Sequence, residues 1–175
     1  MEKLLSFVSN NNEKFIEELK AFLRMPSVSA SPEHSNDMKA TAEYLKNHLI
    51  EIGIKKAEVI TTEKHPLVYG EWIGAPGKPT VLFYGHYDVQ PPHPLELWDS
   101  PPFEPVIKDG KIWARGATDD KGQLFTHLKA IETFMKVKGS LPVNIKIILE
   151  GEEEVGSESL EKFLELNSEK LKCDV

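Results

Sequence analysis

Three short segments place a histidine or acidic residues directly after an apolar run, which is where a binding or catalytic group could be held rigidly. The first is Val81–Val89, in which His86 and Asp88 follow apolar residues and Gly85. Since side chains two positions apart share a face of a strand, His86 and Asp88 are predicted to point the same way. This suits a carboxylate that orients a metal-binding imidazole through its second ring nitrogen. The alternative is a structural histidine paired with a neighbouring acid.

The second segment is Ala114–Gly122, in which Asp119 and Asp120 stand directly before a predicted helix. Adjacent acids at a helix start have a simple structural explanation, because aspartate favours the N-cap and the first turn. The surrounding glycines and the apolar segments on both sides indicate instead a tight, partly buried turn. Both interpretations remain open at this point.

The third segment is Ile147–Ser157, where an apolar run leads into four carboxylates within five residues: Glu150, Glu152, Glu153 and Glu154. Such crowding raises the electrostatic energy of the acids unless a cation or a proton offsets it. The alternative is a solvated acidic turn. In open α/β sheets, ligands bind at the carboxyl ends of the strands, which is where all three segments are predicted to lie.

A histidine with several hard carboxylates suits zinc or a similar divalent metal. In two-metal hydrolases the ions lie roughly 3.5–4 Å apart and polarise the scissile carbonyl, and a further carboxylate can act as general base. The sequence contains no GxSxG elbow, no phosphate-binding P-loop and no cysteine with an evident histidine partner. Covalent catalysis and nucleotide binding are therefore less attractive explanations.

The elements that must position these residues alternate between helices and apolar strands, so we expect a layered α/β domain. No repeat or linker divides the chain. A hairpin is predicted around Asp109-Gly110, and KLKCDV is predicted to begin a further buried strand. Hydrophobic spacing predicts helices over 4–23, 32–52, 122–137 and 157–166. Ser31 is the predicted N-cap of the second helix and Ser157 that of the last. Strands are predicted over 57–62, 66–73, 80–86 and 143–149.

Composition excludes several classes of partner. The net charge of −7 and the pI of about 5.4 argue against a nucleic-acid surface. No apolar run approaches the roughly 20 residues that cross a bilayer. With no convincing signal peptide and a single cysteine, the expected location is cytoplasmic. Cys173 is predicted to be a small buried residue, and His48 is predicted to lie on the surface.

The motifs GHYDVQP, WDSPPFEPVIKDGKIWARGATDDKG and LEGEEEVGS, together with their order, resemble the signatures of a two-zinc metallopeptidase family. That family includes aminoacylases, acetylornithine deacetylases, succinyl-diaminopimelate desuccinylases and carnosinase-like dipeptidases. The resemblance extends from about Val81 to Leu160. It implies a three-layer α/β catalytic domain with a mixed central sheet, and two zinc ions, with cobalt or manganese as alternatives.

The resemblance also implies a role for each candidate residue. His86 binds one zinc ion, Asp119 bridges both ions and Glu154 binds the other. Asp88 orients His86, and Glu153 is the general base that takes a proton from the attacking water. A shift of one residue, which would make Glu152 the base and Glu153 the ligand, is the alternative register. The peptide bond between Asp119 and Asp120 is expected to be cis.

Members of this family carry a further acidic ligand, a histidine ligand near the C-terminus and an inserted lid domain that often supplies the dimer contact. We therefore expect residues 1–175 to be the N-terminal portion of a larger catalytic domain, inactive alone, whose parent forms a homodimer. The expected substrate is a dipeptide. The alternatives are deacylation of an N-acyl amino acid, or a non-catalytic fragment or interaction domain.

Overall fold

Four apolar strands form a mixed sheet in the computed structural model, which describes residues 1–175. β3 and β6 run parallel, whereas β1 with β2 and β2 with β6 are antiparallel. The strand order is β1-β2-β6-β3. The predicted strands and the mixed sheet are confirmed, with these bounds: β1 (Lys56–Ile60), β2 (Leu67–Trp72), β3 (Thr80–His86) and β6 (Asn144–Glu150).

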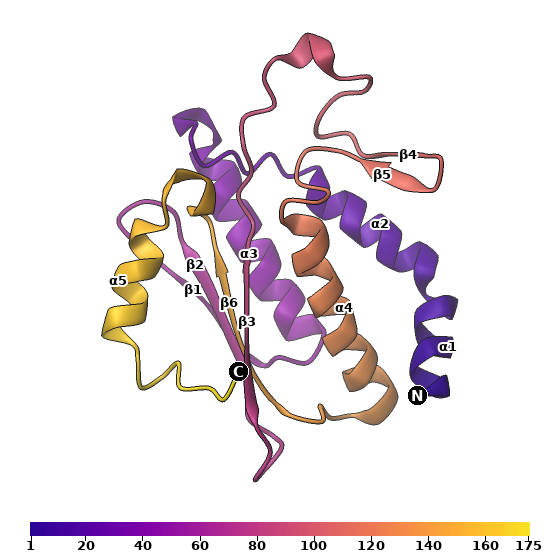
Figure 1. Ribbon diagram of the computed structural model, residues 1–175, viewed down its shortest axis with the longest axis vertical. Helices are drawn as coiled ribbons and strands as arrows, with labels where there is room; N and C mark the ends of the chain where they lie inside the picture. Colours follow the sequence, from indigo (N-terminus) through magenta and orange to yellow (C-terminus); the bar gives the residue numbers. More distant parts are fainter.

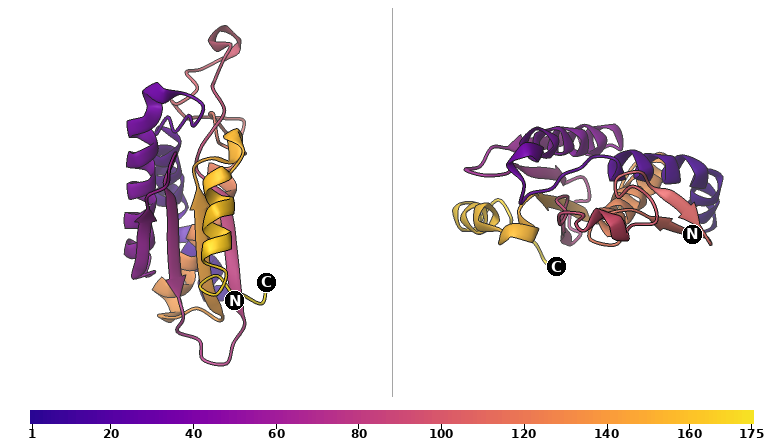
Figure 2. Two further views of the ribbon diagram at one scale, coloured as in Figure 1. Left: turned by 90° about the vertical axis from the view of Figure 1, so that its left-hand side faces the viewer. Right: turned by 90° about the horizontal axis from the view of Figure 1, so that it is seen from above.

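Helices cover both faces of this sheet and make three layers (Figures 1 and 2). α3 (Ser35–Glu51) and α4 (Lys121–Lys138) pack on one face, and α5 (Glu158–Leu166) packs on the other. Successive side chains of β6 point to opposite faces of the sheet and so contribute to two apolar clusters. Ile147 belongs to the larger cluster, and Ile148 belongs to the smaller cluster around Phe163. The predicted three-layer α/β architecture is confirmed.

The N-terminal region departs from the prediction, since the helix expected over 4–23 is broken at Asn11. The two resulting helices are α1 (Glu2–Asn10) and α2 (Asn12–Leu23). Asn11 has non-helical backbone angles, and its side-chain amide donates to the Phe7 carbonyl oxygen at 2.8 Å. Asparagine competes with the helix in this way by hydrogen-bonding to nearby backbone groups.

Ser157 occupies the N-cap position of α5 as predicted, and Ser31 occupies that of a 3-10 turn, but neither makes a side-chain cap hydrogen bond. Ser31 precedes a 3-10 turn, η1 (Pro32–His34), and α3 begins only at Ser35.

A hairpin and a long loop project beyond one end of the sheet, at the top of Figure 1. The hairpin pairs β4 (Val106–Lys108) with β5 (Lys111–Trp113). Its turn residues, Asp109 and Gly110, have φ values of 54° and 71°, as the predicted Asp-Gly turn requires. The loop before it contains a short 3-10 turn, η2 (Leu95–Leu97).

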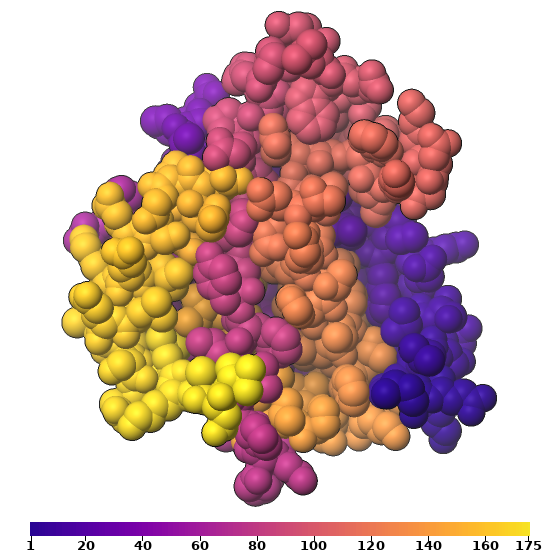
Figure 3. Space-filling view, in the orientation of Figure 1, coloured from indigo at the N-terminus to yellow at the C-terminus, as the bar shows by residue number.

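The last residues lie along the outer edge of β3 (Figure 3). Asp174 donates its backbone N–H to the Thr80 oxygen at 2.8 Å, and Leu82 donates to the Val175 oxygen at 2.8 Å. The segment pairs with the edge of β3 but forms no regular strand, and residues 172–175 are exposed, so the prediction that KLKCDV begins a further buried strand is wrong. Cys173 is exposed, so the prediction that it is buried is wrong.

A buried ion cluster joins α2, α3 and α4. The Lys129 ammonium lies 2.5 Å from Glu18, 2.6 Å from Glu132 and 3.0 Å from Nε2 of His48. Glu18, His48 and Glu132 are close enough together to hold a metal ion. The ammonium already bonds all three, so we assign the cluster to lysine. His48 is buried, contrary to prediction, and burial and Lys129 lower its pKa.

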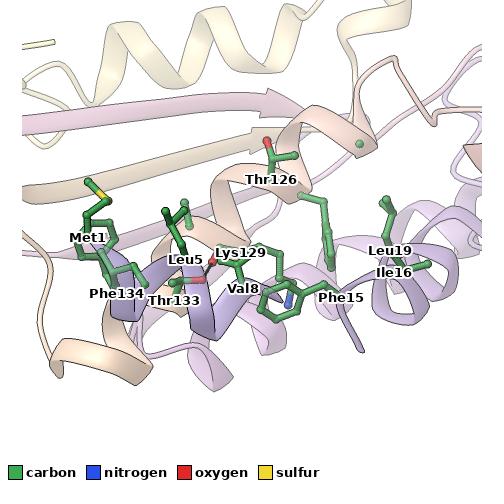
Figure 4. Close-up of a pocket in the computed structure, with 14 residues that line it drawn as sticks. Met1, Leu5, Val8, Phe15, Ile16, Leu19, Thr126, Lys129, Thr133 and Phe134 are labelled. Atoms are coloured by element: carbon green, nitrogen blue, oxygen red, sulfur yellow. Dashed lines mark hydrogen bonds between the residues drawn. The ribbon is translucent and has the colours of Figure 1, made fainter. Parts of the chain in front are cut away.

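An apolar groove of about 480 Å³ lies between α1, α2 and α4 (Figure 4). Leu5, Val8, Ile16 and Phe134 are among its lining side chains. None of the residues singled out for metal chemistry lines this groove. None of the helices has the length and hydropathy that a bilayer span requires.

Lys129→Met tests the ion cluster. Removing the ammonium leaves Glu132, of which only 3% is exposed, with Lys14 as its remaining cationic partner. Breaking a buried ion pair costs about 3–5 kcal/mol, so we expect a loss of that size in the free energy of unfolding. Urea denaturation of the wild type and the variant measures it.

The matched control is Lys20→Met, which removes an exposed pair with Glu17. Surface pairs contribute roughly 0–1 kcal/mol, so the control is expected to unfold almost as the wild type does. Equal losses in the two variants would contradict a stabilising role for the cluster.

Candidate metal centre

All three chemistry-bearing segments meet at the upper end of the sheet in Figure 1, where β3 and β6 finish side by side. The register pairs His86 with Glu150, so the loops that follow the two strands start together. Gly85 admits the turn before α4, because a Cβ atom there would lie only 3.0 Å from Oδ2 of Asp120. The turn before α4 therefore approaches the backbone of β3 closely at Gly85.

His86 is buried, with 5% of its surface exposed, and its two ring nitrogens face different partners. Nδ1 lies 3.1 Å from the backbone oxygen of Asp88 and 3.3 Å from its Oδ1. Nε2 lies 3.0 Å from Oδ1 of Asp119 and 4.0 Å from Oε2 of Glu153. An Nδ1–H that donates to Asp88 fixes the ring orientation, in which Nε2 faces the two carboxylates.

Asp88 is fully buried and connects the end of β3 to the loop after β6. Its Oδ2 accepts a hydrogen bond from the backbone N–H of Glu154 at 3.1 Å. Its Oδ1 is close to His86 but lacks a hydrogen bond of good geometry. One carboxylate thus touches both the histidine and the glutamate loop.

The Asp119-Asp120 turn directs its two carboxylates differently. The peptide bond between them is cis, as expected. The Asp119 side chain is 72% exposed and reaches His86, whereas Oδ2 of Asp120 accepts from the backbone N–H of His86 at 3.2 Å. Asp120 is the N-cap residue of α4 but makes no side-chain cap bond. Helix capping therefore does not explain this pair of acids.

The acidic loop after β6 is only partly solvated. Glu152 is buried, and its carboxylate accepts from the backbone N–H groups of His65 at 2.9 Å and Ser159 at 3.1 Å. Glu153, in the short turn η3 (Glu153–Val155), is exposed and faces His86. The Glu154 carboxylate accepts from Nε2 of Gln90 at 2.6 Å and makes no ion pair with His86. A solvated turn is thus the wrong description for Glu152.

The carboxylates control the protonation of His86. Burial lowers the pKa of the imidazole, but Asp88, Asp120 and Glu153 together outweigh burial and raise the pKa to about 9. Burial, with the neighbouring Asp119, raises the pKa of Asp120. Both pKa values are raised, so both groups bind a proton more readily at this end of the sheet.

The donor set fits a divalent metal. An imidazole nitrogen oriented through its other nitrogen, with two open carboxylates beside it, is the arrangement that such ions accept. The poorly paired Oδ1 of buried Asp88 adds negative charge behind the ring. Of the five predicted site residues, the structure brings His86, Asp88, Asp119 and Glu153 into direct proximity. Glu154 is joined to them through its backbone.

Sequence reasoning missed several residues that hold this centre. Gln90 binds Glu154, and buried Lys121 donates to the carbonyl oxygens of Phe22 at 3.2 Å and Met25 at 2.6 Å. These two hydrogen bonds fasten the start of α4 to the end of α2. Burial lowers the pKa of Lys121 to about 7. Its place directly after the acidic pair was the only available signal.

Comparison with known proteins gives consistent matches. The profile of Peptidase family M20/M25/M40 matches residues 82–175. The chain is 34% identical to a Beta-Ala-His dipeptidase from Rattus norvegicus over 176 residues, which is 94% of this chain and 36% of that protein. It is 46% identical to a succinyl-diaminopimelate desuccinylase from Thiobacillus denitrificans over 76 residues, which is 43% of this chain and 19% of that protein.

The fold agrees with a solved relative. The crystal structure of human carnosine dipeptidase 1 superposes with a TM-score of 0.88 at 31% identity, covering 97% of this chain and 38% of that one. The chain therefore spans little more than a third of the length of the dipeptidases that it matches.

Asp88→Asn tests how the centre is held. The amide keeps the shape of the side chain, and its oxygen can still accept from the Glu154 N–H, but it supplies no negative charge to His86. Loss of such a supporting group typically weakens metal binding by about 10–100-fold. Isothermal titration of the protein with zinc chloride measures the change in Kd.

Asp109→Asn, in the exposed turn of the hairpin, is the matched control and should leave the Kd unchanged. Asp88→Asn binding zinc as tightly as the wild type would show that Asp88 does not support the metal site.

Proposed function

The chain belongs to Peptidase family M20/M25/M40, and from that premise we propose that the protein hydrolyses the peptide bond of a dipeptide with two zinc ions. The observation that supports this best is the His86 ring, held by Asp88 at Nδ1 and facing Asp119 and Glu153 at Nε2. The dipeptidases among its relatives support a small peptide as the substrate.

In this proposal His86 would hold one zinc ion, Glu154 would hold the second, and Asp119 would serve both. Zinc, when bound, polarises the scissile carbonyl and makes the attacking water more acidic. Asp88 keeps the imidazole in the tautomer whose Nε2 is free to bind. The exposure of Asp119 and Glu153 leaves their carboxylates accessible to a substrate.

Glu153 is the proposed general base, which accepts a proton from the water and returns it to the leaving amine. The alternative register, with Glu152 as base, is disfavoured by the contacts of Glu152. Its carboxylate is buried and already accepts from two backbone N–H groups. Glu153 is open to solvent and has its carboxylate 4.0 Å from Nε2 of His86. These contacts support Glu153 as base and Glu154 as ligand.

The further acidic and histidine ligands, the homodimer and the cytoplasmic location implied by the sequence stay predictions. Cobalt and manganese stay alternative ions.

A second candidate is deacylation of an N-acyl amino acid, which the match to the desuccinylase favours. Both reactions cleave an amide bond near a free carboxylate, so the same residues serve either one. Comparing hydrolysis of dipeptides and of N-acetyl or N-succinyl amino acids by the zinc-loaded full-length protein distinguishes the two. We expect faster turnover of dipeptides. Turnover of the acyl substrates alone would favour the deacylase, and the absence of zinc binding would favour a non-catalytic interaction domain.

Replacing each of the two adjacent glutamates by glutamine distinguishes their roles. In the full-length protein, Glu153→Gln removes the base but keeps its shape, so we expect kcat to fall by about 10²–10⁴-fold with little change in KM. Glu154→Gln removes a ligand charge and should instead weaken zinc retention. Steady-state kinetics together with measured zinc content give both results.

Glu152→Gln is the control for this pair. Glutamine has a single acceptor oxygen, so it keeps at most one of the two backbone hydrogen bonds that Glu152 accepts, and the variant should lower the unfolding temperature while the zinc content remains normal. Loss of zinc from Glu153→Gln, together with normal zinc but slow turnover in Glu154→Gln, would contradict the assignment and shift the register by one residue.

A further inference from the structure

Glu150 is a fully buried acid that the proposed chemistry does not use. One carboxylate oxygen, Oε1, accepts from the hydroxyl of Tyr84 at 2.6 Å and from Oγ of Ser157 at 3.0 Å. The other oxygen, Oε2, has no hydrogen-bond partner. Burying a carboxyl group with an unsatisfied oxygen is unfavourable for folding, and such exceptions in native proteins are expected at functional positions.

The bond to Ser157 closes the loop that carries the two catalytic-site glutamates. Glu150 and Ser157 stand on either side of residues 151–156, which contain Glu153 and Glu154. Ser157 has a φ of +55°, in the left-handed region that non-glycine residues rarely adopt. Its backbone N–H donates to the Glu152 oxygen at 2.8 Å, and its hydroxyl donates to Glu150. A strained conformation of this kind persists only where surrounding contacts enforce it.

The bond to Tyr84 ties the same carboxyl group to the histidine strand. Tyr84 precedes His86 by two positions in β3, so both side chains are on the same face of the sheet. Glu150 is also the cross-strand partner of His86 in the parallel register. It is therefore joined to β3 beside the histidine and to the far end of the glutamate loop. Asp88 links the same two segments through His86 and the Glu154 N–H, and Glu150 is a second link between them.

We propose that Glu150 is a positioning residue, which closes loop 151–156 against β3 and so fixes Glu153 and Glu154 relative to His86. This rests on the proposed function, because it gives those glutamates their roles as base and ligand. Burial raises the pKa of Glu150, with Asp88 adding to the rise. A carboxyl group accepts both hydrogen bonds at Oε1 with or without a proton on Oε2, so the closure does not require a full charge.

The test removes each hydrogen-bond donor separately and measures zinc affinity. Ser157→Ala and Tyr84→Phe each delete one hydroxyl and leave Glu150 in place. We expect each to raise the Kd for zinc about 10-fold, at the lower end of what supporting residues of a metal site contribute. The circular dichroism spectrum should be unchanged, and thermal denaturation records the accompanying change in stability.

Tyr69→Phe is the matched control, because Tyr69 donates to Glu71 within β2, away from the loop. It should lower the unfolding temperature but leave the Kd within twofold of the wild type. Glu150→Gln is a second, conservative variant, since its amide oxygen can accept from both hydroxyls. It should lose stability but retain zinc affinity. If Glu150 acted only through overall stability, zinc affinity would fall together with stability.

The outcomes separate the two proposals. Full-length wild-type protein that binds no zinc would overturn the proposed function and this inference with it. Wild-type binding, with Ser157→Ala and Tyr84→Phe both within twofold, would overturn the role of Glu150 alone. A Tyr69→Phe protein that weakens zinc binding as much as the other two would also overturn it, because general destabilisation would then explain the effect.

Discussion

The site depends on one buried carboxylate that serves two segments. Asp88 has no exposed surface, contacts Nδ1 of His86 and accepts the backbone N–H of Glu154. A buried charge is tolerated only where neighbouring groups compensate it, so the ring and the loop must both stay close. That requirement fixes the end of β3 relative to the loop after β6. The Asp119-Asp120 turn is held at the same place, because Asp119 contacts the His86 ring and Asp120 accepts from the His86 backbone N–H.

The sheet brings the segments that Asp88 contacts to the same end of the molecule. β3 and β6 are adjacent and parallel, so their carboxyl ends coincide, and α4 starts at the same end because it connects the two strands. Lys121 then anchors the first turn of α4 to the end of α2. Residues separated widely in the sequence are thereby held within hydrogen-bonding distance. The second ionic cluster, around Lys129, carries its own cation and stabilises helix packing.

Much of this could be predicted from the sequence, because hydrophobic periodicity marks strands and helices and the acids follow apolar strands directly. The elements, the hairpin at Asp109 and the meeting of His86 with Asp119 were accessible in this way. The break at Asn11 was not, since periodicity continues across it while the side chain bonds its own helix end. The burial of His48 and the two backbone hydrogen bonds that the Glu152 carboxylate accepts were not predicted, because both depend on partners distant in sequence. The link from Tyr84 through Glu150 to Ser157 depends on strand register and loop closure, which a single sequence does not define.

The central claim is that His86, Asp119 and the adjacent glutamates form a divalent-metal site. Anomalous diffraction at the zinc absorption edge, from crystals of the protein grown with zinc, tests this directly. We expect an anomalous peak within bonding distance of Nε2 of His86 and the Asp119 carboxylate, and none at Glu18, His48 and Glu132, where Lys129 lies. A peak at that second cluster with none beside His86 would contradict it.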